Sequence, residues 1–177
     1  MWGIVVVRDV AAIRSALMAV RAAAVALFVS PAAVKFAFAA LPKLHFFRTT
    51  RVCAVGAATA RALQRRGIRN VAWPRERQDS EGLLALPELG SLRGRRVALI
   101  GAPGGRELLA QTLRTRRARL ARIEVYRREA PRYSARRLTA LEQAPAPWLL
   151  LVSSADALAH LRAALPLHLF ARLAAGD

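Results

Sequence analysis

The chain has 177 residues, of which 55% are hydrophobic, enough for one sizeable core and too many for a disordered protein. Its formal net charge is +18, from 29 Lys and Arg against 11 Asp and Glu, which favours a polyanionic partner of any kind. Only Lys35 and Lys43 are lysines, and the background is rich in Ala, Leu and Arg. A GC-rich genome produces the same bias, so charge alone selects no function.

Short apolar runs alternate along the chain with segments in which apolar residues recur every three or four positions. The runs predict strands and the periodic segments predict helices. The expected strands are 3–7, 25–29, 51–55, 70–73, 96–100, 119–126 and 148–152, and the expected helices are 10–21, 31–41, 57–66, 80–86, 104–116, 134–143 and 155–165. Because the strands are apolar throughout, both of their faces should be buried. The pattern predicts an α/β fold, a flavodoxin-like or Rossmann-like parallel sheet with helices on both faces.

A polar stretch and a pair of similar segments indicate the domain organisation. Residues 127–134 read RREAPRYS, which is typical of a connection between domains. The segments LFVSPAAVKFAFAALP (27–42) and LVSSADALAHLRAALP (151–166) share a strand, a serine, a helix and a closing Leu-Pro. We therefore expect one nearly complete domain at 8–126, a connection at 127–133, and part of a second, similar domain at 134–177.

Cysteine usage and the N-terminal sequence indicate the compartment, and cysteine and histidine usage together bear on metal binding. Cys53 is the single cysteine, and the three histidines lie on separate segments without ligand spacing, so no disulfide or metal site is predicted. The N-terminus lacks the basic start and cleavage site of a signal peptide, and the charge-free segment 22–34 is too short to cross a bilayer. We expect a cytoplasmic protein without a membrane partner.

Three predicted strands end in small or polar residues, at Ser30, 56–59 and 101–105. Ligands of open parallel sheets bind beyond such carboxyl ends, where helix N-termini offer free N–H groups. The loop GAPGGRE matches neither the dinucleotide nor the P-loop fingerprint. Gly104 and Gly105 leave two amides unobstructed, and Arg106 adds a guanidinium suited to carboxylates. The loop therefore either binds an anion or only allows a tight turn.

Two further side chains have both a structural and a functional interpretation. Thr59, in the first turn of a predicted helix, could donate its hydroxyl to a ligand or cap its own helix, and capping is the commoner role. Tyr126 ends a predicted strand, where tyrosine usually packs with its hydroxyl at the surface; in a cleft it could protonate a leaving oxygen. No serine lies in a G-x-S-x-G motif, so nucleophilic hydrolysis is not predicted.

The arginine-rich stretch 114–128 is the best candidate for nucleic-acid binding. It contains a single tyrosine and is interrupted by a predicted strand, so it offers no platform on which bases could stack. A solvated helix face explains it better, and no nucleic-acid partner is expected.

Six segments, in this order, resemble the uroporphyrinogen-III synthase family: LFVSPAAV, AVGAATARAL, DSEGLLALPEL, GGRELLAQTLR, EVYRR and LLVSSADAL. The resemblance implies two similar α/β domains, one inserted in the other, joined by a two-stranded ladder that GIVVVRD and VYRREAP would form. It also implies a lyase of haem biosynthesis. Its substrate would be hydroxymethylbilane, an open tetrapyrrole with eight carboxylates, which is dehydrated and cyclised with inversion of ring D through a spiro intermediate.

The resemblance assigns roles to particular residues. Tyr126 is the expected proton donor, and the expected substrate-binding residues are Ser30, Thr59, Gly104, Gly105, Arg106 and Ser153. No cofactor is implied, and we expect a monomer. The family has a further strand and helix before Gly3 and a second glycine-threonine loop past Asp177, so the sequence suggests a fragment of a longer gene product or a degraded copy. The alternatives are a nucleotide-binding α/β module and a basic nucleic-acid-binding protein.

Overall fold

A computed structural model describes residues 3–6, 9–104, 107–129, 133–145, 151 and 155–175. The chain divides into two compact units, one formed by Val6–Arg127 and the other by Met1–Val5 with Arg128–Asp177. Strands β1 (Gly3–Val6) and β7 (Tyr126–Glu129) pair in a two-stranded sheet. These strands come from the two segments that the resemblance assigns to a ladder.

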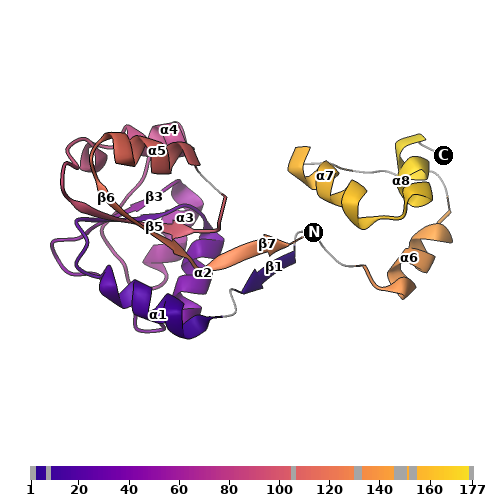
Figure 1. Cartoon of the computed structure of the whole chain (residues 1–177), viewed down its shortest axis with the longest axis horizontal. Coiled ribbons are helices and arrows are strands. Elements are labelled where there is room, and N and C mark those ends of the chain that lie inside the picture. Colours follow the sequence, from indigo (N-terminus) through magenta and orange to yellow (C-terminus); the bar gives the residue numbers. More distant parts are fainter. Residues whose placement is uncertain are drawn as a thin grey trace. The chain divides into compact units, whose positions relative to one another are not determined.

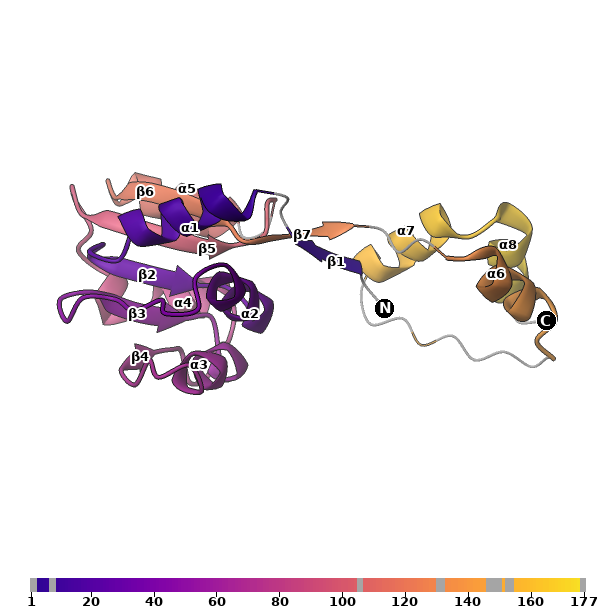
Figure 2. The same ribbon diagram turned by 90° about the horizontal axis from the view of Figure 1, so that it is seen from below.

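The larger unit, Val6–Arg127, is built on five parallel strands in the order β4-β3-β2-β5-β6 (Figure 2). Their bounds are Val25–Phe28 for β2, Arg51–Ala54 for β3, Val71–Ala72 for β4, Arg96–Gly101 for β5 and Arg119–Glu124 for β6. Counted from β2, this order is 3-2-1-4-5, which matches the first five strands of the Rossmann order 3-2-1-4-5-6 and differs from the flavodoxin order. From β2 the chain adds β3 and β4 on one side and then crosses back to place β5 on the other side of β2. The adjacent strands β2 and β5 therefore form the topological switch point.

Helices cover both faces of the sheet, as the sequence predicts (Figure 1). One face carries α1 (Val10–Ala19), α2 (Pro31–Ala40) and α3 (Ala57–Gln64); the other carries α4 (Ser80–Leu84), the 3-10 helix Pro87–Leu89 and α5 (Glu107–Thr115). Strand β2 is buried on both sides because alternate residues enter the two cores. Ala26 and Phe28 pack under α1 and α2, whereas Val25 and Leu27 pack under α4 and α5.

Short polar side chains cap the N-termini of several of these helices. Ser30 Oγ accepts a hydrogen bond from the Ala33 N–H, and Pro31 occupies the first turn of α2. Asp79 accepts from the Gly82 N–H in the same way at the start of α4. Helix α3 differs, because its N-cap residue is Gly56, which has no side chain to supply such a bond.

The prediction of a single strand at 119–126 was wrong. Strand β6 ends at Glu124, the Val125 N–H donates to the Gly101 carbonyl, and Tyr126 begins β7. The polar sequence around Arg127 predicts a connection between domains, but this residue also lies in β7. Val125 and Tyr126 extend the apolar run in sequence, so periodicity could not reveal that the strand leaves one sheet for another. Of the predicted strand 148–152, only Leu151 is described, and it lies outside any strand.

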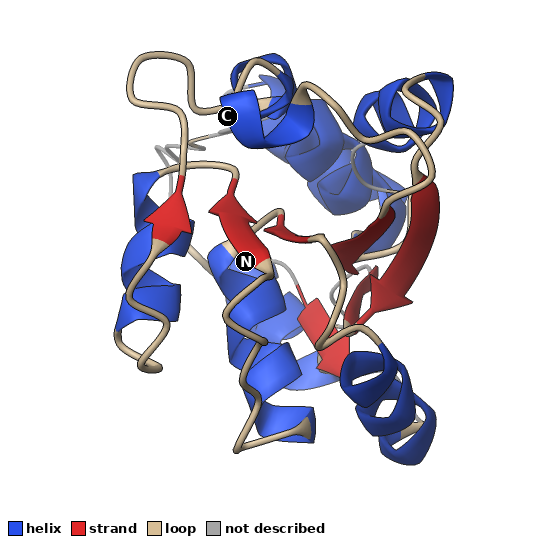
Figure 3. Ribbon diagram, turned by 90° about the vertical axis from the view of Figure 1, so that its left-hand side faces the viewer, coloured by secondary structure: helices blue, strands red, loops and turns tan. Residues whose placement is uncertain are grey.

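The described part of the smaller unit contains α6 (Ala135–Glu142), α7 (Ala155–Ala164) and α8 (Leu167–Ala175), drawn among the blue helices of Figure 3. Sequence periodicity missed α8. Its Arg172 Nη1 donates to the Glu142 carbonyl oxygen at 2.8 Å, and Leu169 is buried. Within the described ranges, we find no helix with the length and apolarity needed to cross a bilayer.

Candidate functional site

Tyr126 lies beyond the carboxyl ends of the parallel strands, and its hydroxyl meets Ser30. The Tyr126 OH and Ser30 Oγ are 3.0 Å apart. Tyr126 is only 2% exposed, and its ring stacks on that of Phe36 from α2, with centroids 5.6 Å apart and planes 25° apart. Because Tyr126 follows β6 and Ser30 follows β2, the tyrosine side chain reaches over the intervening strand β5 to the switch point.

Ser30 contacts both α2 and Tyr126 through one oxygen. Its Oγ accepts from the Ala33 N–H at 3.0 Å, which satisfies one lone pair and holds the side chain in place. Either hydroxyl can donate in the contact between Ser30 and Tyr126. If Ser30 donates, the Tyr126 proton is free to be given to another group, and Ser30 remains a donor to the oxygen left behind.

Thr59 is 1% exposed, and no described residue hydrogen-bonds its hydroxyl. The capping role that its position suggested is filled by another residue. Gln78, from the loop before α4, accepts from the Ala57 N–H through its Oε1 at 2.8 Å. Sequence reasoning missed Gln78, because it lies 21 positions from Ala57 and no local pattern connects the two.

Of the glycine-rich loop after β5, the structure describes Gly101 to Gly104; Gly105 and Arg106 lie outside the described residues, as does Ser153 in the second unit. Gly104 has φ = +68°, a conformation that favours glycine, so the loop contains the expected tight turn. The first turn of α5 carries Glu107, whose carboxylate binds Arg122 at 3.0 Å and approaches Arg114 at 3.6 Å. These arginines offset a negative charge that would oppose an anion there.

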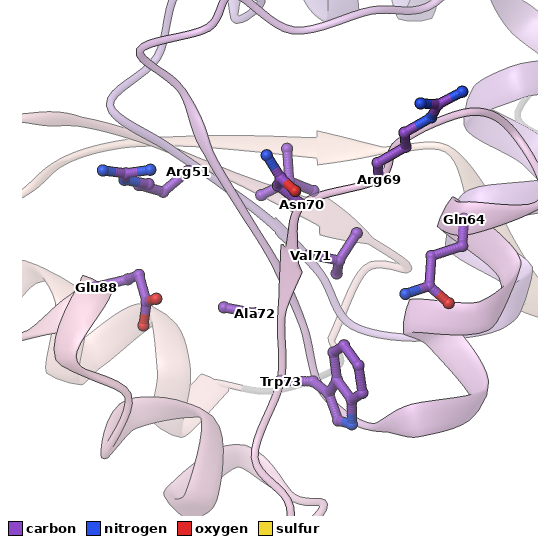
Figure 4. Close-up of a pocket in the computed structure, with 9 residues that line it drawn as sticks. Arg51, Gln64, Arg69, Asn70, Val71, Ala72, Trp73 and Glu88 are labelled. Atoms are coloured by element: carbon purple, nitrogen blue, oxygen red, sulfur yellow. The ribbon is translucent and has the colours of Figure 1, made fainter.

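A separate pocket of about 400 Å³ flanks the edge strand β4 (Figure 4). Arg51 and Glu88 lie on one side of the strand, and Gln64 and Trp73 lie on the other. None of the residues predicted to form the site lines this pocket. It is thus distinct from the strand ends that carry Ser30, Thr59 and Tyr126.

Burial raises the pKa of the Cys53 thiol from 9.0 to about 12, and the nearby Glu88 carboxylate adds to the effect. A thiol held protonated is a poor nucleophile. Among the described residues, no three His, Cys, Asp or Glu side chains gather as a metal site would require.

Fold and geometry together define a class of protein. The larger unit is a Rossmann-type α/β domain in which a buried tyrosine, a helix-capping serine and a buried threonine follow the carboxyl ends of the strands. Proteins of this class bind small ligands at that edge of the sheet.

Comparison with known sequences narrows the class to a family. A family model described as "Uroporphyrinogen-III synthase HemD" matches residues 2–168, and the chain belongs to this family. It is 41% identical over 83 residues to the uroporphyrinogen-III synthase of Salmonella typhimurium (strain LT2), covering 47% of this chain and 34% of that protein. It is 34% identical over 113 residues to the Escherichia coli (strain K12) enzyme, covering 64% of this chain and 46% of that protein. The matches thus span about a third to a half of these relatives.

Solved structures agree on the fold. A mutant uroporphyrinogen III synthase from the extremely thermophilic bacterium Thermus thermophilus superposes with a TM-score of 0.65 at 23% identity, over 95% of this chain and 68% of that one. The wild-type enzyme gives a TM-score of 0.53 at 26% identity, over 71% of this chain and 49% of that one.

Proposed function

We propose that the gene product containing this chain is a uroporphyrinogen-III synthase, a lyase that dehydrates and cyclises hydroxymethylbilane with inversion of ring D. Membership of the family supports this proposal. The observation that carries it within the structure is the contact between Tyr126 and Ser30 at the switch point of the sheet.

The reaction needs few chemical groups. Loss of the substrate hydroxyl as water breaks a C–O bond, and the departing oxygen needs a proton. Tyr126 donates that proton, while Ser30 Oγ donates a hydrogen bond to the resulting phenolate. The phenolate regains a proton when the cyclised product loses one, so the protons balance over the cycle. The stacked ring of Phe36 holds the phenol in place.

The other proposed residues bind the substrate. A flexible octacarboxylate must be folded so that its terminal carbon meets the substituted position of ring D, and this positioning accounts for much of the catalysis. Thr59 and Ser153, with Gly104, Gly105 and Arg106, are proposed to supply hydroxyl, amide and guanidinium donors to the carboxylates, and Ser30 is proposed to bind the substrate beside Tyr126. The net charge of +18 favours such a ligand.

The working state is proposed to be a monomer in the cytoplasm, acting on a small molecule without a nucleic-acid partner. The buried free thiol of Cys53 fits a reducing compartment. Size-exclusion chromatography with light scattering tests the monomer directly, and a stable dimer would contradict it.

The test of the proposed function is product analysis with hydroxymethylbilane generated in place. The full gene product should yield the type III isomer, whereas spontaneous closure yields type I. Y126F keeps the ring stacked on Phe36 but removes the proton donor, so turnover should fall by about 100-fold or more. Type I product alone from the full gene product would reject the proposal, and an unchanged Y126F rate would reject Tyr126 as the acid.

A further inference from the structure

The loop between β4 and α4 carries a side chain to which the proposed function assigns no role. Gln78 Oε1 accepts from the Ala57 N–H at 2.8 Å. A backbone N–H can bond only to the oxygen of a side-chain amide, so this contact sets which end of the Gln78 amide faces α3. The Nε2 group is left with two N–H donors, and no described residue accepts from them.

The surrounding loop is built to hold Gln78 in place. On one side of it, Arg77 forms ion pairs with Asp79 and Glu81. On the other side, Asp79 caps α4 by accepting from the Gly82 N–H at 2.8 Å. The loop also packs tightly on α4, because a Cβ at Gly82 would overlap the Arg77 carbonyl oxygen. These contacts restrain the backbone on both sides of Gln78.

The Gln78 amide also requires a glycine opposite. A Cβ at Gly56 would lie 2.6 Å from Gln78 Oε1 and 3.0 Å from its Cβ. Gly56 has φ = −176°, an extended conformation open to any residue, so the backbone itself does not demand glycine here. Space for Gln78 is the reason that a side chain is excluded.

Thr59 independently indicates a ligand at this end of α3. Its side chain lies in the first turn, leans toward the helix N-terminus as helical side chains do, and is 1% exposed. Its hydroxyl has no hydrogen-bonding partner among the described residues. Among the described residues, every side-chain oxygen that is fully buried has a hydrogen-bond partner. The Thr59 hydroxyl has none, so it must belong to the small part of this residue that is exposed.

We propose that Gln78 is a substrate-binding residue, whose Nε2 donates to a carboxylate of the ligand beside the Thr59 hydroxyl. The proposal rests on the proposed function for the class of ligand, a polycarboxylate. Gln78 then has two tasks: its oxygen caps α3, and its nitrogen extends the row of donors at the strand ends. A carboxylate in its place would perform the first task and oppose the second.

The variant Q78E separates these tasks. The introduced carboxylate would still accept from the Ala57 N–H, and a negative charge at a helix N-terminus is favourable, so the melting temperature should be unchanged or higher. The same charge repels a ligand carboxylate, and we expect the Kd for uroporphyrinogen III, kept reduced and measured by calorimetric titration, to rise at least tenfold. Q78A, which removes the donors without adding charge, should raise it severalfold.

Q64E is the matched control. It makes the same charge change at the far end of the helix that Gln78 caps, about 10 Å from Ala57 along the helix axis, and should change the Kd less than twofold. Equal weakening by Q78E and Q64E, or no weakening by Q78E and Q78A, would overturn the role of Gln78 while leaving the proposed function standing. All titrations use the full gene product, and absence of saturable uroporphyrinogen III binding by its unsubstituted form would overturn both.

Discussion

The hydroxyl groups of Tyr126 and Ser30 lie 3.0 Å apart and join the first residue of β7 to the N-cap of α2. The two residues are 96 positions apart in sequence. Since Ser30 also caps α2, one oxygen connects the stability of the larger unit to the proposed chemistry.

A double-mutant cycle should measure this connection. S30A removes the cap of α2 and the partner of Tyr126, and should lower the free energy of unfolding by about 1 to 2 kcal/mol. Y126F alone should cost about 1 kcal/mol, because the ring contact with Phe36 remains. The double variant should lose about 0.5 to 1 kcal/mol less than the sum of the two, as measured by urea unfolding. Strict additivity would show that the two hydroxyls contribute independently.

Substitution of Gly56 should affect binding more than stability. In G56A the new Cβ overlaps Gln78 Oε1 and lies close to the Gln78 Cβ, so the amide is displaced at the expense of one capping hydrogen bond worth about 1 kcal/mol. Once displaced, Gln78 can no longer present its Nε2 to the ligand. Ligand titration and urea unfolding of the same variant check both effects. A fully retained affinity would contradict the placement of Gln78.

Substitution of Gly82 should instead be severe for folding. A Cβ there meets the backbone carbonyl of Arg77, which cannot rotate away, so α4 and its preceding loop must separate. We expect G82A to lose about 3 kcal/mol of unfolding free energy. Gly90 is the matched control, since it has helical dihedral angles as the C-cap of the 3-10 helix and its Cβ would lie 3.4 Å from the Pro87 carbonyl oxygen, an ordinary contact. G90A should therefore be nearly neutral, and similar losses in the two variants would contradict this account.

Cys53 should make the fold less stable in alkaline solution. Burial raises the pKa of its thiol from 9.0 to about 12, so above pH 9 the unfolded chain releases a proton that the folded chain retains. Stability then falls as pH rises, by at most about 1.4 kcal/mol per pH unit between these values. Relative to C53A, the wild-type protein should lose about 1 kcal/mol between about pH 8 and pH 10 in urea unfolding.

Thiol labelling provides an independent check on Cys53. A disulfide reagent should modify the folded protein only as fast as it unfolds, because the thiol is fully buried and protonated. Rapid labelling without denaturant would contradict its burial.

Much of the larger unit could be predicted from local patterns. Strands β2 and β5 are continuous apolar runs, and α2 begins at a Ser-Pro pair, so their positions follow from burial on two faces and from capping chemistry. The same patterns indicate Ser30, Thr59 and Tyr126 as candidate site residues. They could not predict which strand is adjacent to which, since that depends on pairing between segments far apart in sequence.

Local sequence accounts for the α/β alternation, the buried strands and the polar residues at their ends, because burial and helix capping act over a few neighbouring residues. Three features depend on tertiary structure. Strand order places the switch point between β2 and β5; the exchange of sheets at Val125 turns Tyr126 toward Ser30; and the loop at Gln78 caps a helix 21 positions earlier. Each is a contact between distant segments, and its energy exists only once the chain has folded around both.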